Sequence, residues 1–309
     1  MNIRDHIKDL KHNHPKLFKK SSLWGGAMVG HAWLMILAAT ATAVYFNNII
    51  VSIIAIMLIG SRQLGLAILM HEAAHKTLFK SSKINDVIGS WFCSLPVIYD
   101  LKAYRSYHLT HHKNTQSSND PDLHLSSKFP VTLLSMTRKI LRDLTGITGL
   151  KLRFFQFRSM FRDSQKNAAN TAIRFFQSIY KYLISQAIIF VVFLFLFNIQ
   201  AYLIYWLIPL ITWMQVVTRI RNISEHAMVS DNINPLLHAR RTDVNLFERI
   251  FFAPYYVNYH LEHHLLVSVP FFRLKKLAKL LDQTFKNSQM EVQKGYLKVL
   301  KLAITSNSS

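Results

Sequence analysis

Residues 23–61 read LWGGAMVGHAWLMILAATATAVYFNNIIVSIIAIMLIGS, a run of 39 residues without Asp, Glu, Lys or Arg. A second run, residues 182–218, holds 37 residues and also lacks these four charged types. Because one helical membrane span needs about 20 apolar residues, each run has the length of two spans joined by a tight turn. The sequence therefore predicts an integral membrane protein with four transmembrane helices in two hairpins, at about residues 24–46, 49–70, 183–197 and 202–217.

The charged residues are strongly biased toward Lys and Arg, with 37 of them against 16 Asp and Glu and a formal net charge of +21. All of these Lys and Arg lie outside the two uncharged runs. By the positive-inside rule, the segments before, between and after the runs are expected on the cytoplasmic side. Basic residues there face anionic headgroups, so the charge indicates a membrane surface as the partner and no nucleic acid.

Composition divides the chain into a basic cytoplasmic arm (1–22), a single membrane domain (23–304) and a polar tail (305–309). Within the domain, residues 84–98 and 128–181 are apolar or basic and aromatic, and they predict interfacial segments that do not span the membrane. The expected fold is all-α, with a cytoplasmic helical cap beside the four spans. The single cysteine excludes a disulfide framework, an iron–sulfur cluster and a Cys-rich zinc site.

Histidines form three dense clusters, or boxes, in the charged segments. Residues three and four apart lie on one face of a helix, so each box projects its imidazoles toward a common point. With 15 His in the chain, a chance HxxHH spacing is expected about 0.03 times, so its occurrence twice is not coincidence. Eight imidazoles exceed the four ligands of a structural zinc and suit two metal ions. The boxes are His71 and His75; His108, His111 and His112; and His260, His263 and His264.

This ligand set indicates a particular chemistry. Imidazole suits iron, zinc or copper, whereas soluble di-iron bundles use Glu and Glu-x-x-His ligands, and dimetal hydrolases also carry carboxylates. A set without a repeating carboxylate favours redox chemistry at a membrane face, with iron activating oxygen and a lipid-like substrate. Glu72, Glu225 and Glu262 lie inside or beside histidine motifs, where we expect them to orient ligating imidazoles without binding metal themselves.

The boxes and their flanks resemble the integral-membrane fatty acid desaturase family. The flanks are Arg62-Gln63-Leu64-Gly65 before the first box, Asn85 after it, and Asn258-Tyr259 and Val269-Pro270 around the third. The likeness covers roughly residues 60 to 280. The chain is most similar to the short bacterial members, which suggests a bacterial inner membrane.

The resemblance implies two iron ions held mainly by histidines, with a ninth ligand after the fourth span and an Asn one helical turn earlier holding a metal-bound water. His226 and Asn222 match these positions. The family's chemistry is the oxygen-dependent removal of two hydrogens from an acyl chain, carried by a lipid or by CoA. The electrons are expected from a separate carrier of the ferredoxin or cytochrome b5 type.

Other functions fit parts of the same pattern. Related boxes serve lipid hydroxylases and ketolases, which differ in product and not in ligand set. A His-rich membrane metal transporter is a more distant alternative, because its ligands should line the spans at mid-depth. The basic helix beginning near Arg273 could dock an acidic electron carrier, an acyl carrier protein or anionic lipid, but we favour the simpler interpretation of a solvated positive-inside surface.

A few polar residues outside the boxes have simpler interpretations. His31, alone in the first span, is expected to be packed and hydrogen-bonded, and Arg62 to pair inside the bundle or contact substrate. The acidic turn at residues 119–122 is expected to cap a helix. His124 and His238 have no partner at box spacing, so the sequence gives no reason to include them in the site.

Overall fold

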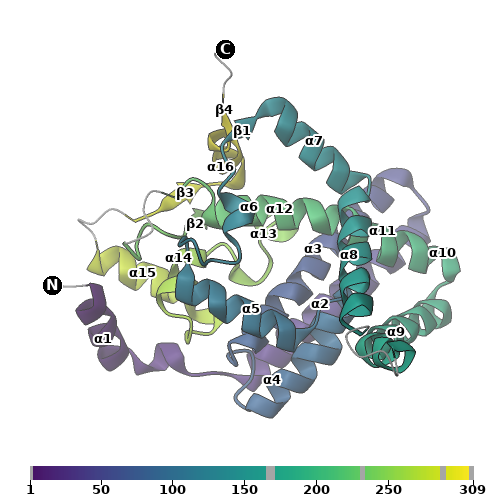
Figure 1. Cartoon of the computed structure of the whole chain (residues 1–309), viewed down its shortest axis with the longest axis horizontal. Helices are drawn as coiled ribbons and strands as arrows, with labels where there is room; N and C mark the ends of the chain where they lie inside the picture. Colours follow the sequence, from purple (N-terminus) through teal and green to yellow (C-terminus); the bar gives the residue numbers. More distant parts are fainter. Residues whose placement is uncertain (1–2, 165–170, 230–233, 286–289, 306–309) are drawn as a thin grey trace.

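The structure is a computed structural model that describes residues 3–164, 171–229, 234–285 and 290–305. Within these residues the chain is mostly helical, as predicted (Figure 1). The fold departs from all-α in two pairs of short parallel β-strands, with two or three residues in each strand, which are too short to form a layer. The paired strands are β1 (Val131–Thr132) with β4 (Ile304–Thr305), and β2 (Arg241–Asp243) with β3 (Val292–Lys294).

Among the described residues, four helical stretches are long and apolar enough to cross a membrane. The predicted turn between the first two is confirmed: Asn47 ends the first helix in the left-handed region (φ 44°), and the Asn48 side chain accepts from the first N–H groups of the second. The four stretches are α2 (Ser22–Phe46), α3 (Ile49–Ala74), α9 (Thr171–Leu196), and Ile199–His226, which combines α10 (Ile199–Tyr202), η5 (Leu203–Leu207), α11 (Ile208–Ile211) and α12 (Trp213–His226).

Three of these helices extend beyond the predicted membrane spans. α3 continues past residue 70 to Ala74, α9 begins at Thr171 instead of residue 183, and the fourth stretch continues past residue 217 to His226. A search for uncharged residues finds only the apolar part of such a helix. The helical hydrogen bonding continues into the polar extensions, and two of these extensions carry histidines of the predicted site.

The other described helices are shorter, and several are amphipathic. The segment predicted as interfacial at 84–98 is helical, and the basic and aromatic segment after residue 128 forms two helices that precede α9. These helices are α1 (Ile3–Asn13), η1 (Pro15–Phe18), α4 (Ser82–Ile88), η2 (Gly89–Ser94), η3 (Leu95–Val97), α5 (Leu101–Asn114), α6 (Leu123–Ser126), α7 (Leu133–Leu144), α8 (Ile147–Ser164), α13 (Leu246–Phe251), η6 (Pro254–Tyr256), α14 (His260–Leu265), η7 (Phe271–Arg273), α15 (Leu274–Thr284) and α16 (Tyr296–Leu302).

Helix α3 lies at the centre of the molecule and packs against α2, α12, α5 and η6 (Figure 1). On α2, small and β-branched side chains at helical spacing form the buried face, among them Ala32, Ile36 and Ala43. The contact between α3 and α12 is close at Gly60, where a Cβ atom would lie 3.0 Å from the backbone nitrogen of Met214. α3 and α12 carry histidines at their C-terminal ends, so this packing fixes the relative position of two parts of the predicted site.

Candidate metal centre

Four helical segments, far apart in the sequence, supply the histidines. The first box lies at the end of α3, and the ninth histidine ends α12. The second box lies on α5, which begins where the Asp100 side chain accepts from the Ala103 N–H at 2.7 Å. The third box fills the short helix α14. Residues three and four apart lie on one face only when the segment is helical, and each box is helical, as predicted.

All nine predicted histidines come together, in two groups within the described residues. Each histidine offers one ring nitrogen, and inside a group these atoms lie within 4.8 Å of one another. The five-histidine group consists of His71, His75, His108, His112 and His263. The four-histidine group consists of His111, His226, His260 and His264.

The spacing of the ring nitrogens fits metal binding. The Nε2 atoms of His108 and His112 are 2.9 Å apart, and those of His226 and His260 are 2.8 Å apart. Metal–nitrogen bonds of about 2.1 Å would place neighbouring ligand nitrogens about 3.0 Å apart at right angles and about 3.4 Å apart in a tetrahedron. In addition, the buried Nε2 atoms of His71 and His75 have no hydrogen-bond partner among the described residues. Buried polar atoms normally have partners, and a metal ion at the five-histidine group would supply them.

The protonation state also fits. Burial, with help from the charge of Arg105, lowers the pKa of His75 to about 4. Burial and the neighbouring imidazoles of His75 and His111, with His238, lower the pKa of His112 to about 2. Neutral imidazole is the form that binds a metal. The same causes, burial first and neighbouring imidazoles second, hold the pKa well below its usual value in His108, His260, His263 and His264.

A carboxylate that was not predicted to belong to the site contacts one of the nine histidines. Asp120 is buried, and its Oδ1 atom lies 2.7 Å from Nδ1 of His111. Burial by itself would raise the pKa of Asp120, but the hydrogen bonds from His111 and from the backbone N–H groups of Asp122 and Gln116 outweigh it and lower that pKa. The ionised carboxylate therefore fixes the orientation of the His111 ring.

The acidic turn at residues 119–122 was predicted to cap a helix, and this prediction was wrong for the side chains. Asp122 occupies the position before α6, yet its side chain makes no capping hydrogen bond and instead accepts from the Tyr107 hydroxyl. Asp120 binds His111, as described above. An acidic residue nine positions after a box histidine in the same segment is the sequence signal that could have suggested this contact.

Two of the three box glutamates lie beside imidazoles, and all three are buried. That they orient these imidazoles stays a prediction. Glu225 Oε2 lies 3.5 Å from His260 Nε2, and its Oε1 accepts from Arg221 Nε at 2.6 Å. Glu72 Oε1 lies 3.5 Å from His71 Nδ1, while Oε2 accepts from Thr77 and from the Phe271 N–H.

Glu262 is fully buried but contacts an arginine. Its Oε1 atom accepts from Arg241 Nη1 at 2.9 Å, and the other end of that guanidinium donates to Asp282 at 2.8 Å. Burial raises the pKa of Glu262 to about 7 against the opposing charge of Arg241. This ion pair attaches the helix of the third box to α15 through Asp282.

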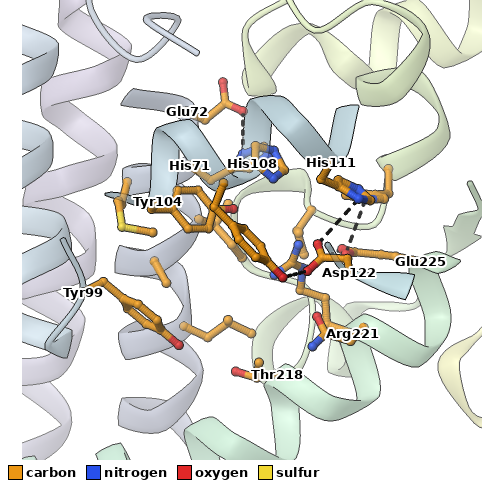
Figure 2. A pocket seen from close by; sticks show the side chains of 18 of the residues that line it. His71, Glu72, Tyr99, Tyr104, His108, His111, Asp122, Thr218, Arg221 and Glu225 are labelled. Atoms are coloured by element: carbon orange, nitrogen blue, oxygen red, sulfur yellow. Dashed lines mark hydrogen bonds and ion pairs between the residues drawn. The ribbon is translucent and has the colours of Figure 1, made fainter. Parts of the chain in front are cut away.

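A cavity of about 610 Å³ adjoins both groups. Figure 2 shows His71, His108 and His111 on its wall, with Asp122, Arg221 and Glu225 close to His111. Asn222, the predicted water-holding residue, also lines this cavity one helical turn before His226. The cavity therefore brings a substrate-sized space against the imidazoles of both groups.

The remaining polar residues behave largely as the sequence suggested. His31 Nδ1 lies 3.1 Å from the Tyr255 hydroxyl, so the packed and hydrogen-bonded interpretation is confirmed. Arg62 is buried inside the bundle, where Nη2 donates to the Ile250 carbonyl and to Ser61. His238, which the sequence analysis left out, provides the carbonyl that faces His226 Nδ1 at 3.4 Å.

Comparisons with known proteins agree with the geometry. The sequence model of the fatty acid desaturase family matches residues 47–296. The chain is 27% identical over 244 residues to dihydrorhizobitoxine desaturase of Bradyrhizobium elkanii, a match that covers 74% of this chain and 66% of that protein. It is 22% identical over 249 residues to sn-1 oleoyl-lipid 12-desaturase of Picosynechococcus sp., a match that covers 74% of this chain and 68% of that protein. The chain thus spans about two thirds of the length of these relatives.

Proposed function

The chain belongs to the fatty acid desaturase family, and from this membership and the two histidine groups we propose that it introduces a double bond into an acyl chain of a lipid. The observation that carries the proposal is the convergence of nine imidazoles from four helical segments beside one cavity. The name of one relative, sn-1 oleoyl-lipid 12-desaturase, supports an acyl-lipid substrate over acyl-CoA.

The proposal includes the arrangement in the membrane. The four apolar stretches form two hairpins, and the histidine-bearing helix ends belong to a cytoplasmic cap at the inner membrane of a bacterium. The distribution of Lys and Arg supports this orientation, because all of them lie outside the two uncharged runs. Both termini then lie on the cytoplasmic side, with residues 1–22 as a basic arm of the single domain 23–304.

The nine histidines are the proposed ligands of two iron ions, one for each group. The short nitrogen–nitrogen distances and the two orphaned buried Nε2 atoms support this assignment. Asn222 is proposed to hold a water at the four-histidine group, since it lines the cavity one turn from His226. When bound, the iron pair supplies the oxygen-dependent oxidation that an unactivated C–H bond requires.

The protein's own contribution is to orient the imidazoles and the acyl chain and to exclude water from the cavity. Asp120 accepts from Nδ1 of His111, which leaves Nε2 of that ring available to the ion. The Arg221–Glu225 ion pair keeps the charge of Glu225 compensated beside His260. The cavity holds the acyl chain against the imidazoles, so that one carbon pair is presented for reaction.

The overall reaction takes one hydrogen from each of two adjacent carbons and leaves a double bond between them. One O2 accepts these two hydrogens, two further electrons and two protons, and yields two water molecules. The extra electrons require a donor, for which we propose a separate ferredoxin or cytochrome b5 type carrier, acting at the cytoplasmic face.

The test is the lipid composition of a bacterial host with and without this chain. Mass spectrometry should detect acyl chains lighter by two hydrogens in cells that express the wild type, and none in cells that express His263→Ala. A matched control is His12→Ala, an exposed histidine on α1 outside both groups, which should retain the product. Membrane insertion of all three proteins is checked by fractionation.

The same experiment distinguishes the two alternatives. Products that only gain one oxygen would assign the chain to hydroxylation and overturn the desaturase proposal. Unchanged lipids together with metal uptake that depends on His263 would favour a transporter.

A further inference from the structure

The cavity beside the histidine groups has an exposed rim and a buried end. Tyr107, Leu125 and Leu152 line it with 39–46% of their surface exposed, whereas Leu64 and Tyr255 line it and are only 1% and 8% exposed. A substrate of the size of an acyl chain can therefore be admitted at the rim but not at the other end.

The positions of the rim, the imidazoles and the buried end can be compared along the axis of α3. One rim residue, Tyr107, lies on α5, which is attached at the level of Ala74, whose carbonyl accepts from Arg105 Nε at 2.9 Å. His71 follows, and Leu64 lies seven residues before it, about 10 Å further along the helix axis. Between the two, Ala67 and Ile68 line the cavity on the same face of α3. The imidazoles thus lie between the Tyr107 side of the rim and the buried end.

Tyr255 lines the buried end, and its ring is held from several sides. A Cβ atom at position 65 would lie 2.6 Å from Tyr255 Cε2, so the ring packs directly on α3 where glycine leaves room. The Arg62 guanidinium lies 5.7 Å from the ring centroid, and the hydroxyl lies 3.1 Å from His31 Nδ1. Phe271 contacts the ring edge to face. The side chain has little freedom to move aside for a longer ligand.

The backbone at Tyr255 is also unusual. Its φ of 53° and ψ of 41° lie in the left-handed region, which bulky residues rarely adopt, and Tyr256 has a φ of 62°. Such conformations persist where the surrounding structure enforces them, and they are frequent at functional sites. This turn directs the ring toward α3 just before the third histidine box.

We propose that Tyr255 is a specificity-determining residue that limits how far the apolar tail of the substrate extends beyond the histidine groups. Gly65, Arg62 and His31 are positioning residues that act through the ring. This inference rests on the proposed function and adds the structural element that selects acyl length.

The opposing explanation is that Tyr255 only fills the core. The two explanations differ in what a substitution changes. A core residue affects stability and total activity for all chain lengths alike, whereas the end wall of a cavity changes the ratio between lengths. For an apolar pocket, one methylene changes selectivity by roughly 10-fold or more.

Two substitutions should move the selectivity in opposite directions. Tyr255→Leu removes the ring and should shift the preference toward longer acyl chains, by about 10-fold in the ratio of neighbouring lengths. Gly65→Ala pushes the ring into the cavity and should shift it toward shorter chains. If Gly65→Ala does not fold, Leu64→Phe narrows the same end. The double variant that combines Gly65→Ala with Tyr255→Leu relieves the clash and should again accept the longer chains.

Matched controls make similar changes away from the cavity. Tyr205→Leu removes another buried tyrosine, whose hydroxyl binds Ser52. Gly60→Ala crowds the contact of α3 with Met214. Both controls should lower stability without changing the ratio between acyl lengths.

The measurement uses the iron-loaded, full-length protein in vesicles of saturated phosphatidylglycerols that differ only in acyl length. The vesicles are supplied with O2 and with a ferredoxin and its reductase as electron donor, and the products are quantified by mass spectrometry. A second readout is the increase in Tm that free saturated fatty acids of the same lengths produce. If the wild type forms no unsaturated product, the proposed function fails, and the Tm series still tests the role of Tyr255. Identical length profiles for Tyr255→Leu, Gly65→Ala and the controls in both readouts would overturn the inference.

Discussion

The two histidine groups use the same side chain but are oriented in different ways. In the four-histidine group, three Nδ1 atoms face protein acceptors: His111 faces Asp120 at 2.7 Å, His264 faces Thr115 at 3.3 Å, and His226 faces the carbonyl of residue 238 at 3.4 Å. In the five-histidine group, the corresponding contact among the described residues is that of His71 with Glu72, at 3.5 Å.

This difference indicates that hydrogen bonds orient the rings of the four-histidine group, whereas helix position and packing orient those of the five-histidine group. The latter draws two histidines each from α3 and α5, spaced one helical turn apart. Substitution of hydrogen-bond partners should therefore affect iron at the four-histidine group much more than at the five-histidine group.

Loss of a ligand should have the largest effect. His263→Ala removes an imidazole from the five-histidine group, and we expect bound iron to fall from about two ions to about one per chain and product to fall at least about 100-fold. Iron is measured by mass spectrometry of the purified protein. Retention of both ions would show that His263 is not a ligand.

Asp120→Asn should have the second-largest effect on iron binding. Replacing the carboxylate by an amide weakens the hold on His111, and we expect a loss of iron affinity of roughly 10- to 100-fold, as is typical for such partners of metal ligands. Competition with a chelator measures the affinity. Asp9→Asn, an exposed change on α1, is the control and should have no effect. Equal affinities for the two variants would contradict the proposed role of Asp120.

Thr115→Val tests an uncharged hydrogen-bond partner of a histidine in the four-histidine group. The longer contact with His264 involves an uncharged hydroxyl, so we expect a loss of iron affinity of only about fivefold, which corresponds to about 1 kcal/mol. The chelator assay applies again. A loss as large as that of Asp120→Asn would mean that the charge of Asp120 is not what distinguishes the two contacts.

Glu72→Gln should have the smallest effect on iron. The main contacts of Glu72 are with Thr77 and the Phe271 N–H, and its distance to His71 is 3.5 Å. We expect iron affinity to change by less than about threefold, with stability reduced by about 1–2 kcal/mol. Chelator competition and thermal unfolding measure the two quantities. A drop in iron affinity as large as that of Asp120→Asn would contradict the proposed difference in how the rings of the four-histidine and five-histidine groups are oriented.

The sequence predicted those features that follow from local spacing. Two uncharged runs indicated the four apolar helices, and the box spacings indicated eight histidines that do converge. His226 was reached only through the family resemblance, because an isolated NxxxH pair has no distinctive spacing. The histidines were predictable because a helix turns repeated spacing into a shared face.

Contacts between distant segments were not predictable. Asp120 reaches His111 through the turn at residues 119–122, and Tyr255 reaches Gly65 and His31 from another part of the chain. Their geometry depends on how helices pack and on a left-handed backbone that no local rule assigns to tyrosine. The helices extend beyond the predicted membrane spans because apolar composition ends before the helical hydrogen bonding does.

Helices α5 and α14 each contribute to both groups: α5 gives His108 and His112 to one and His111 to the other, and α14 gives His263 to one and His260 with His264 to the other. Adjacent residues on a helix diverge by about 100°, so neighbouring side chains point to different groups. The nine donors include no shared carboxylate that would bridge the pair. The separation of two ions bound at these groups would thus be set by the geometry of α5 and α14, and a distortion of either helix would alter both groups at once.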